Sequence, residues 1–77
     1  MKISVKYFAS IRDLVGKDSE KLNVSPGLSA EEVWNLITNE SKMPDNLLVA
    51  VNYEYVNIKY VLKDGDEVAF FPPVTGG

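Results

Sequence analysis

The sequence predicts an α+β domain in which one main helix packs on a mixed sheet of four to five strands. Three observations support this prediction. Segments with the alternating or continuously apolar character of strands stand near both ends of the chain. The middle holds one stripe of apolar residues with helical spacing. The chain has 77 residues, of which 45% are hydrophobic, and this is enough for one small folded domain.

The first part of the chain predicts two strands joined by a short helical or turn segment. Residues 2–8 alternate between polar and apolar side chains, as a half-buried strand does. The apolar face of this strand consists of Ile3, Val5 and Tyr7. Residues 9–15 form a short helix or turn that Gly16 closes. A second strand follows over residues 21–24, with the turn sequence Ser-Pro-Gly after it.

The main helix begins after Ser29, which is a favourable N-cap residue. Glu32 stands three residues later and completes a capping box. The apolar stripe of the helix consists of Ala30, Val33, Trp34 and Ile37, with Leu36 as a further candidate. We expect Trp34 in the core, and Pro44 makes continuation of the helix past residue 43 unfavourable.

The later part of the chain predicts a third strand at 47–51, a turn at 52–54 and a short extended piece at 59–62. A turn around Gly65 then leads into the last strand at 67–71. The order of two strands, one helix and then further strands favours the ubiquitin-like β-grasp. Periodicity alone leaves a ferredoxin-like arrangement as an alternative.

Composition excludes several classes of function. The net charge of −3 and the pI near 4.7 argue against a nucleic-acid partner, and they permit a partner with a basic docking surface. Because the chain has no cysteine and no histidine, it cannot form a disulfide, a thiolate metal site or a Cys–His catalytic pair. We expect a cytoplasmic protein with no membrane partner, since no segment resembles a signal peptide or a membrane span.

The last residues suggest a reactive tail. We predict a folded domain over residues 1–71 and an extended tail over residues 72–77, where Pro72 and Pro73 favour a stiff path of at most about 20 Å. Gly76 and Gly77 carry no Cβ, so the terminal carbonyl is open to attack. Conversion of this carboxylate to an acyl-adenylate would let a sulfur donor form a thiocarboxylate. The alternative is a frayed end or a cloning scar.

An exposed aromatic pair is expected where the tail leaves the body. Phe8 breaks the alternation of the first strand, and Phe71 falls on the opposite face of the last strand from Val68 and Phe70. If these strands are parallel neighbours, Phe8 and Phe71 lie side by side as a binding anchor. The alternative is that each is an ordinary exposed aromatic. Arg12 is either a partner contact or a solvated surface residue.

We expect no metal site and no cofactor-binding residues. Asp64, Asp66 and Glu67 form an acidic group, but they surround the turn at Gly65 and are better explained as turn residues.

Three segments resemble a known family: residues 5–16, residues 48–56 and residues 62–77, the last with the sequence LKDGDEVAFFPPVTGG. With these segments the chain resembles the small subunits of molybdopterin synthase, the MoaD-type sulfur carriers of the ubiquitin-like, ThiS-like group. The last segment is highly specific, whereas residues 17–45 carry little of the resemblance.

The resemblance implies a β-grasp fold and a set of partners. It implies ATP-dependent adenylation of Gly77 by an E1-like activating enzyme, followed by conversion to a thiocarboxylate. The tail then enters the large synthase subunit and gives sulfur to precursor Z, the cyclic pyranopterin monophosphate. Two large and two small subunits form the complex, the active site lies on the large subunit, and no cofactor is bound permanently to the carrier.

The resemblance also implies partner contacts for particular residues. The interface positions of the family fall on Phe8, Tyr55 and Phe71, with Arg12 nearby. The tail positions expected to contact the partner are Pro72, Pro73, Val74 and Thr75. The family often has Phe where this chain has Tyr7, and some members have Leu where it has Tyr55. The alternatives are a thiamine-pathway sulfur carrier, a ubiquitin-like protein modifier and a passive β-grasp interaction module.

Overall fold

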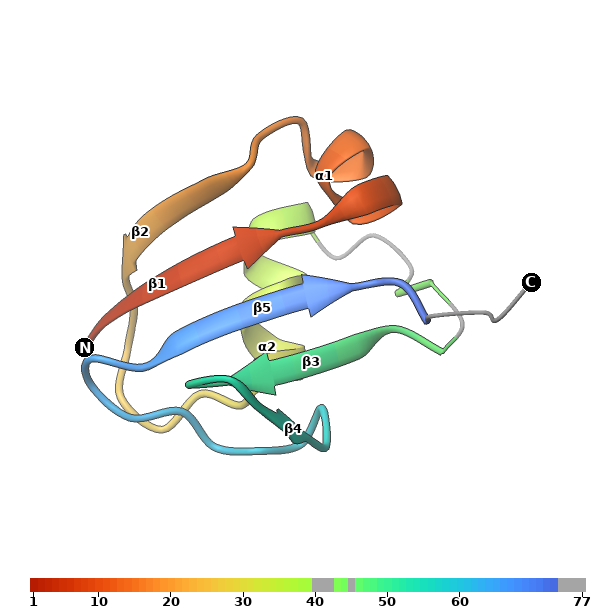
Figure 1. Cartoon of the computed structure of the whole chain (residues 1–77). Coiled ribbons are helices and arrows are strands. Elements are labelled where there is room, and N and C mark those ends of the chain that lie inside the picture. Colours follow the sequence, from red (N-terminus) through yellow and green to blue (C-terminus); the bar gives the residue numbers. More distant parts are fainter. Residues whose placement is uncertain (40–42, 45, 74–77) are drawn as a thin grey trace.

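The computed structural model describes residues 1–39, 43–44 and 46–73. One sheet holds five strands in the order β2-β1-β5-β3-β4 (Figure 1). The strands are β1 (Lys2–Tyr7), β2 (Ser19–Asn23), β3 (Leu48–Val51), β4 (Glu54–Val56) and β5 (Glu67–Phe71), and the helices are α1 (Ala9–Val15) and α2 (Ala30–Thr38). Within the described part of the chain, neither helix is long and apolar enough to cross a membrane.

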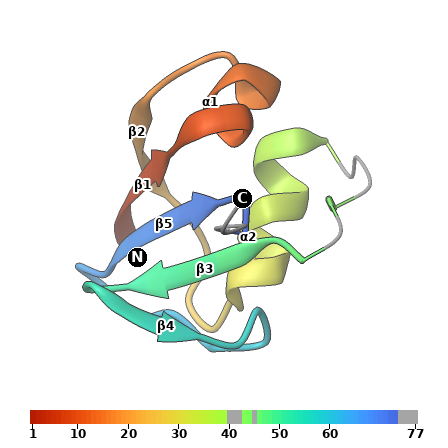
Figure 2. The same cartoon turned by 45° about the vertical axis from the view of Figure 1, so that its right-hand side comes forward.

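The sheet is mixed, and its centre is the parallel pair of β1 and β5. The other pairs, β1 with β2, β5 with β3 and β3 with β4, are antiparallel. The helix α2 lies behind the sheet in both views and covers one face, which leaves the other face open (Figures 1 and 2). This is the predicted β-grasp. The ferredoxin-like alternative, with its β-α-β-β-α-β order, does not fit.

The core lies between the covered face of the sheet and α2. Alternate residues of β1 and β5 point into it, so Ile3, Val5, Val68 and Phe70 are buried as predicted. Trp34 of α2 is fully buried, and its ring meets the Phe70 ring edge-on at a centroid distance of 5.2 Å. The inward side of β5 is therefore committed to the core.

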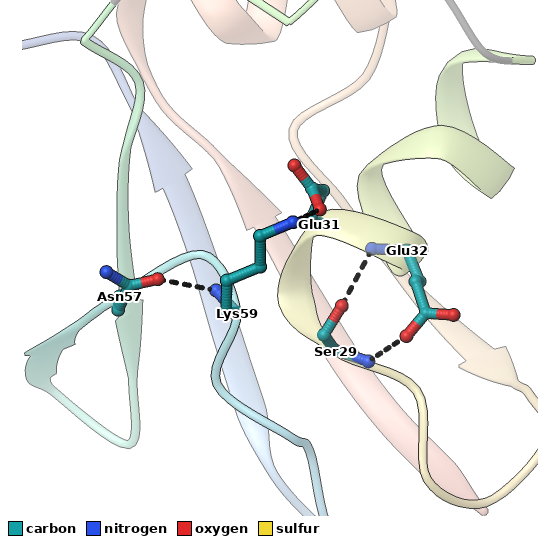
Figure 3. A network of polar contacts seen from close by, with 5 residues as sticks. All are labelled: Ser29, Glu31, Glu32, Asn57 and Lys59. Atoms are coloured by element: carbon teal, nitrogen blue, oxygen red, sulfur yellow. Dashed lines mark hydrogen bonds and ion pairs between the residues drawn. The ribbon is translucent and has the colours of Figure 1, made fainter.

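The start of α2 is fixed by the predicted capping box (Figure 3). The Glu32 amide donates to Ser29 Oγ at 3.2 Å, and the Ser29 amide donates to Glu32 Oε1 at 3.0 Å. Hydrogen bonds from the Ser29 backbone and side chain lower the pKa of Glu32. In the same view, Lys59 pairs with Glu31 and ties the segment after β4 to the first turn of α2.

Several element boundaries differ from those expected. The second strand begins at Ser19 and ends at Asn23, rather than spanning 21–24. Leu36 is exposed and does not join the apolar stripe. The expected extended piece at 59–62 does not join the sheet as a strand, and within it Val61 makes an isolated bridge to Ser29.

The clearest difference is β4, which the sequence analysis does not predict. The sequence pattern predicts a turn at 52–54. In the structure the chain reverses after β3 within two residues, Asn52 and Tyr53, and Glu54 already pairs with Val51. Both turn residues have positive φ, 52° and 70°, as a type I′ turn requires. Tyrosine is uncommon at such a φ, and its presence there hides the hairpin in the sequence.

We expect the capping box to contribute measurably to stability. Replacing Ser29 with alanine removes the acceptor for the Glu32 amide, and the free energy of unfolding should fall by about 1 kcal/mol. Urea unfolding, monitored by circular dichroism, measures this change in the free energy of unfolding. The matched control is Ser25→Ala at an exposed position outside the helix, where the change should stay within about 0.5 kcal/mol. Equal unfolding midpoints for the two variants would contradict the assignment.

The hydroxyl of Tyr7 stands at the edge of the core. It donates to Glu20 Oε2 at 2.6 Å, across the β1–β2 pair. Burial of the side chain raises the pKa of Tyr7 well above its ordinary value, and the hydrogen bond and the charge of Glu20 raise it further. The folded protein therefore keeps this proton at a pH where the unfolded chain has lost it.

This difference predicts a loss of stability at alkaline pH. The contribution of Tyr7 to the free energy of unfolding is complete below the pKa of about 10 that the side chain has in the unfolded chain. It declines as the pH rises toward the pKa of Tyr7 in the folded protein, by up to about 1.4 kcal/mol per pH unit. In Tyr7→Phe the decline above about pH 10 should be shallower. Tyr55→Phe is the control, because Tyr55 is exposed. Denaturant melts between pH 8 and 11 test this, and parallel curves for all three proteins would contradict it.

Candidate functional site

Phe71 is the last residue of β5 and lies on the open face of the sheet, as predicted. It pairs in register with Leu48 of β3. Its neighbour Phe70 points into the core, so the two consecutive phenylalanines serve opposite sides of the sheet. The folded part of the chain thus places an aromatic side chain directly before Pro72, where the predicted tail begins.

The register that keeps Phe71 outside is fixed at the other end of β5. The Gly65 amide donates to the Lys2 carbonyl at 2.7 Å, and the Lys2 amide donates to Asp64 Oδ1 at 2.7 Å. Gly65 has a φ of 87°, which glycine adopts without strain. Because a slip of one residue would turn Phe71 inward, this turn controls which of the two phenylalanines lies on the open face of the sheet.

Phe8 lies beside Phe71, which confirms the expected juxtaposition. The two rings meet edge-on, with centroids 6.4 Å apart and planes 84° apart. Phe8 follows β1 directly, and its amide donates to the Phe70 carbonyl at 3.2 Å. Ala9, with a φ of 52°, then turns the chain sharply into α1. The Phe8 side chain is left 49% exposed at the end of the central strand pair.

Tyr55 completes the group from the other side. It lies in β4 opposite Ala50, and its ring is 5.6 Å from the Phe71 ring. Ala69 is the neighbour of Ala50 in the sheet, so the two residues beside the rings on this face have small side chains. We call Phe8, Tyr55 and Phe71 the aromatic cluster. Phe71 touches both other members and is its centre.

Arg12 lies near the cluster but not within it. It belongs to α1 and borders a shallow hollow of about 250 Å³ that Phe8 also lines. Its Nε is 3.7 Å from Asp18 Oδ1, and both side chains are mostly exposed. An exposed pair at this distance contributes little to stability. The guanidinium therefore remains accessible to an approaching carboxylate.

Only the first two residues of the predicted tail belong to the described residues. Pro72 and Pro73 follow Phe71 and are partly buried. The other predicted tail residues lie outside the described residues: Val74, Thr75, Gly76 and Gly77. The division into a domain at 1–71 and a tail at 72–77 stays a prediction.

Of the acidic residues around Gly65, Asp64 and Asp66 act as turn residues, whereas Glu67 begins β5 and pairs with Lys6. Asp66 is buried and accepts hydrogen bonds from the Lys63 amide at 2.8 Å and from Asn52 Nδ2 at 3.0 Å. Within residues 1–39, 43–44 and 46–73, no group of three side chains has the composition of a metal site. The carboxylate of Asp66 is engaged in holding the β3–β4 turn to the start of β5.

Sequence patterns alone identified two of the three cluster members. Phe8 and Phe71 follow from the alternation of two strands. The residues alone make Tyr55 only a weaker candidate, no better than Tyr53 or Tyr60, and the family resemblance singles it out. Tyr55 could not be placed from the sequence because β4 was not predicted, and a residue can be assigned to a face of the sheet only when its strand is known. Asn52 at the first position of a two-residue turn could have revealed the hairpin.

Comparison with known proteins extends the likeness to the whole chain. The model of the ThiS family matches residues 5–77. The chain is 42% identical to the molybdopterin synthase sulfur carrier subunit of Escherichia coli (strain K12), over 97% of this chain and 99% of that protein.

Solved structures share the fold. The putative molybdopterin converting factor, subunit 1, from Pyrococcus furiosus is 34% identical with a TM-score of 0.79, over 96% of this chain and 99% of that one. SAMP1 from Haloferax volcanii has a TM-score of 0.81 over 100% of both chains, and its 21% identity shows the fold alone. The matched family model, the full-length relatives and the topology agree, and the chain belongs to the ThiS family.

Proposed function

We propose that this chain is the sulfur carrier subunit of a molybdopterin synthase. The observation that carries the proposal is the place of Phe71. It is the centre of an exposed aromatic cluster, and it is also the last strand residue before a chain end that has no charged side chain. A partner that binds this cluster would hold the start of the tail, so one docking event would aim the terminal glycines.

The proposed chemistry takes place at the carboxylate of Gly77. An E1-like enzyme joins a carboxylate oxygen to the α-phosphorus of ATP, and pyrophosphate leaves. A sulfide-level nucleophile from an external donor then attacks the acyl carbon, AMP leaves with its bonding pair, and a thiocarboxylate remains. The thiocarboxylate sulfur forms a bond to a carbon of precursor Z, and water then cleaves the bond between this sulfur and the acyl carbon, which leaves the sulfur on the pterin and restores the carboxylate. The chain has no cysteine, so it cannot supply the sulfur itself.

The partner in sulfur transfer is, in this proposal, the large synthase subunit, in a complex of two large and two small chains. We assign the active site to that subunit and propose that the carrier is not an enzyme alone. The names of the relatives support a subunit role. The docking anchor is the aromatic cluster of Phe8, Tyr55 and Phe71, and Arg12 adds a polar contact at its border. The tail residues Pro72 to Thr75 contact the partner as the end of the chain enters it.

A charged residue at the centre of the cluster should abolish docking without unfolding the body. Phe71→Glu places a carboxylate between two aromatic rings on the open face, and the affinity for the large subunit should fall at least about 100-fold, as for an interface hot spot. Isothermal titration calorimetry measures this. The control is Tyr60→Glu, since Tyr60 is outside the cluster. Both variants should keep native circular dichroism. An unchanged affinity for folded Phe71→Glu would contradict the docking face.

The tail chemistry has a direct test by intact mass. Incubation with activating enzyme, ATP and a sulfur source should raise the mass by the difference between one sulfur and one oxygen atom. A variant lacking Gly77 should show no such change, although its folded body and its cluster remain. Covalent joining to lysines of other proteins, stable to reducing agent, would instead indicate a protein modifier. Unmodified wild-type protein would contradict the proposal.

A further inference from the structure

The open face of the sheet has two chemically different halves. Over β3, β4 and the end of β5 it is mostly apolar and carries most of the aromatic cluster, while Glu67 at the start of β5 shares the face and pairs with Lys6. Over β1 and β2 it carries lysines. Lys2 and Lys6 alternate with the buried residues of β1, and Lys21 of β2 pairs with Ser4, which shares their face. A chain of net charge −3 thus presents a basic surface next to its apolar one.

Two of these lysines are unpaired. Lys6 lies 3.3 Å from Glu67, which offsets its charge. Lys2 and Lys21 have no ion-pair partner among the described residues. Asp64 lies near Lys2, but its Oδ1 accepts from the Lys2 backbone amide. The two free ammonium groups are the charges available to a ligand on this face.

Lys2 and Lys21 border one hollow. They are diagonal neighbours across the antiparallel pair, since Lys2 stands opposite Asn23 and Lys21 opposite Ser4. Diagonal positions are about 7–8 Å apart. A hollow of about 450 Å³ lies there, with Ser4 and Asn23 also in its lining. Two like charges repel each other across this space, and a carboxylate placed between them removes the repulsion.

The area needed for a specific complex extends the interface toward this hollow. A standard interface takes about 800 Å² from each partner. At about 200 Å² for a whole aromatic side chain, the exposed parts of the three cluster residues supply less than half of that. Part of the remaining contact comes from Arg12 and from Pro72 to Thr75, which the proposed function already assigns to the partner, and the rest has to come from the same face of the sheet. The basic hollow lies on that face, about 20 Å from Phe8 along β1.

We infer that the docking face extends along β1 and β2 to the basic hollow, and that the large synthase subunit meets it there with a carboxylate. This inference rests on the proposed function and adds to it the chemistry of the partner. Net charge alone permits a basic partner surface, whereas the charge of this face favours an acidic one. A polyanion fits less well, because it has no apolar surface for the cluster and the rest of the chain repels it.

Charge reversal at the hollow tests the inference. Affinity and association rate for the large subunit are measured by surface plasmon resonance for the wild type, for Lys21→Glu and for Lys2→Glu combined with Lys21→Glu. We expect about 10-fold weaker binding for the single variant and a larger loss for the double variant, mainly through slower association. Added salt should weaken binding of the wild type more than that of the double variant.

The matched control is Lys59→Glu, which makes the same charge change beside α2 and away from the open face (Figure 3). It should bind within about twofold of the wild type. Thermal melts verify that each variant is folded.

Phe71→Glu distinguishes a failure of the extension to the hollow from a failure of the aromatic anchor. If it abolishes binding while both hollow variants bind like the wild type, the extension is wrong and the aromatic anchor stands. If it too binds normally, the proposed docking face is wrong as a whole. Binding of the wild type to DNA or to phosphatidylserine vesicles, lost in the double variant while the affinity for the large subunit is unchanged, would assign the hollow to a polyanion and overturn the inference.

Discussion

The parallel pairing of β1 with β5 is the constraint on which the structure depends. It joins residues near the two ends of the chain, with Val5 beside Val68 and Tyr7 beside Phe70, and it forms the centre of the sheet. Closing such a distant contact is entropically costly, so its register has to be fixed by strong local features. The turn at Gly65 and the buried side chains of both strands provide them.

The same pairing creates the site. Parallel strands end at the same edge, so the residue after β1 and the last residue of β5 emerge together as Phe8 and Phe71. The antiparallel β3–β4 hairpin then brings Tyr55 to the other side of Phe71. Within the described residues, five strands and two helices thereby hold three rings from distant parts of the chain at the end of β5, directly before Pro72.

Periodicity and capping rules predicted most of this fold. The alternation of residues 2–8, the capping box at Ser29 and the opposed faces of Phe70 and Phe71 all have local physical causes that a sequence displays. The hairpin at Asn52 was not predicted, because its second turn residue, Tyr53, has an uncommon φ for its type.

The basic surface over β1 and β2 could not be predicted from the sequence, for a different reason. Net charge averages over the whole surface, whereas the pairing of Lys21 with Ser4 depends on the register of β1 with β2. Only that register brings Lys21 close to Lys2. Likewise, the exposed position of Leu36 depends on how α2 is rotated against the sheet.

The central position of β5 also matters mechanically. A partner that grips the end of the chain pulls on a strand bonded on both sides, by β1 and by β3. Force along the strand axis loads both ladders in shear, so many backbone hydrogen bonds resist together rather than opening one by one. An edge strand such as β4 would resist the same load with one ladder instead of two. A pull on the chain beyond Phe71 is therefore shared by two ladders, and β5 can bear it without leaving the sheet.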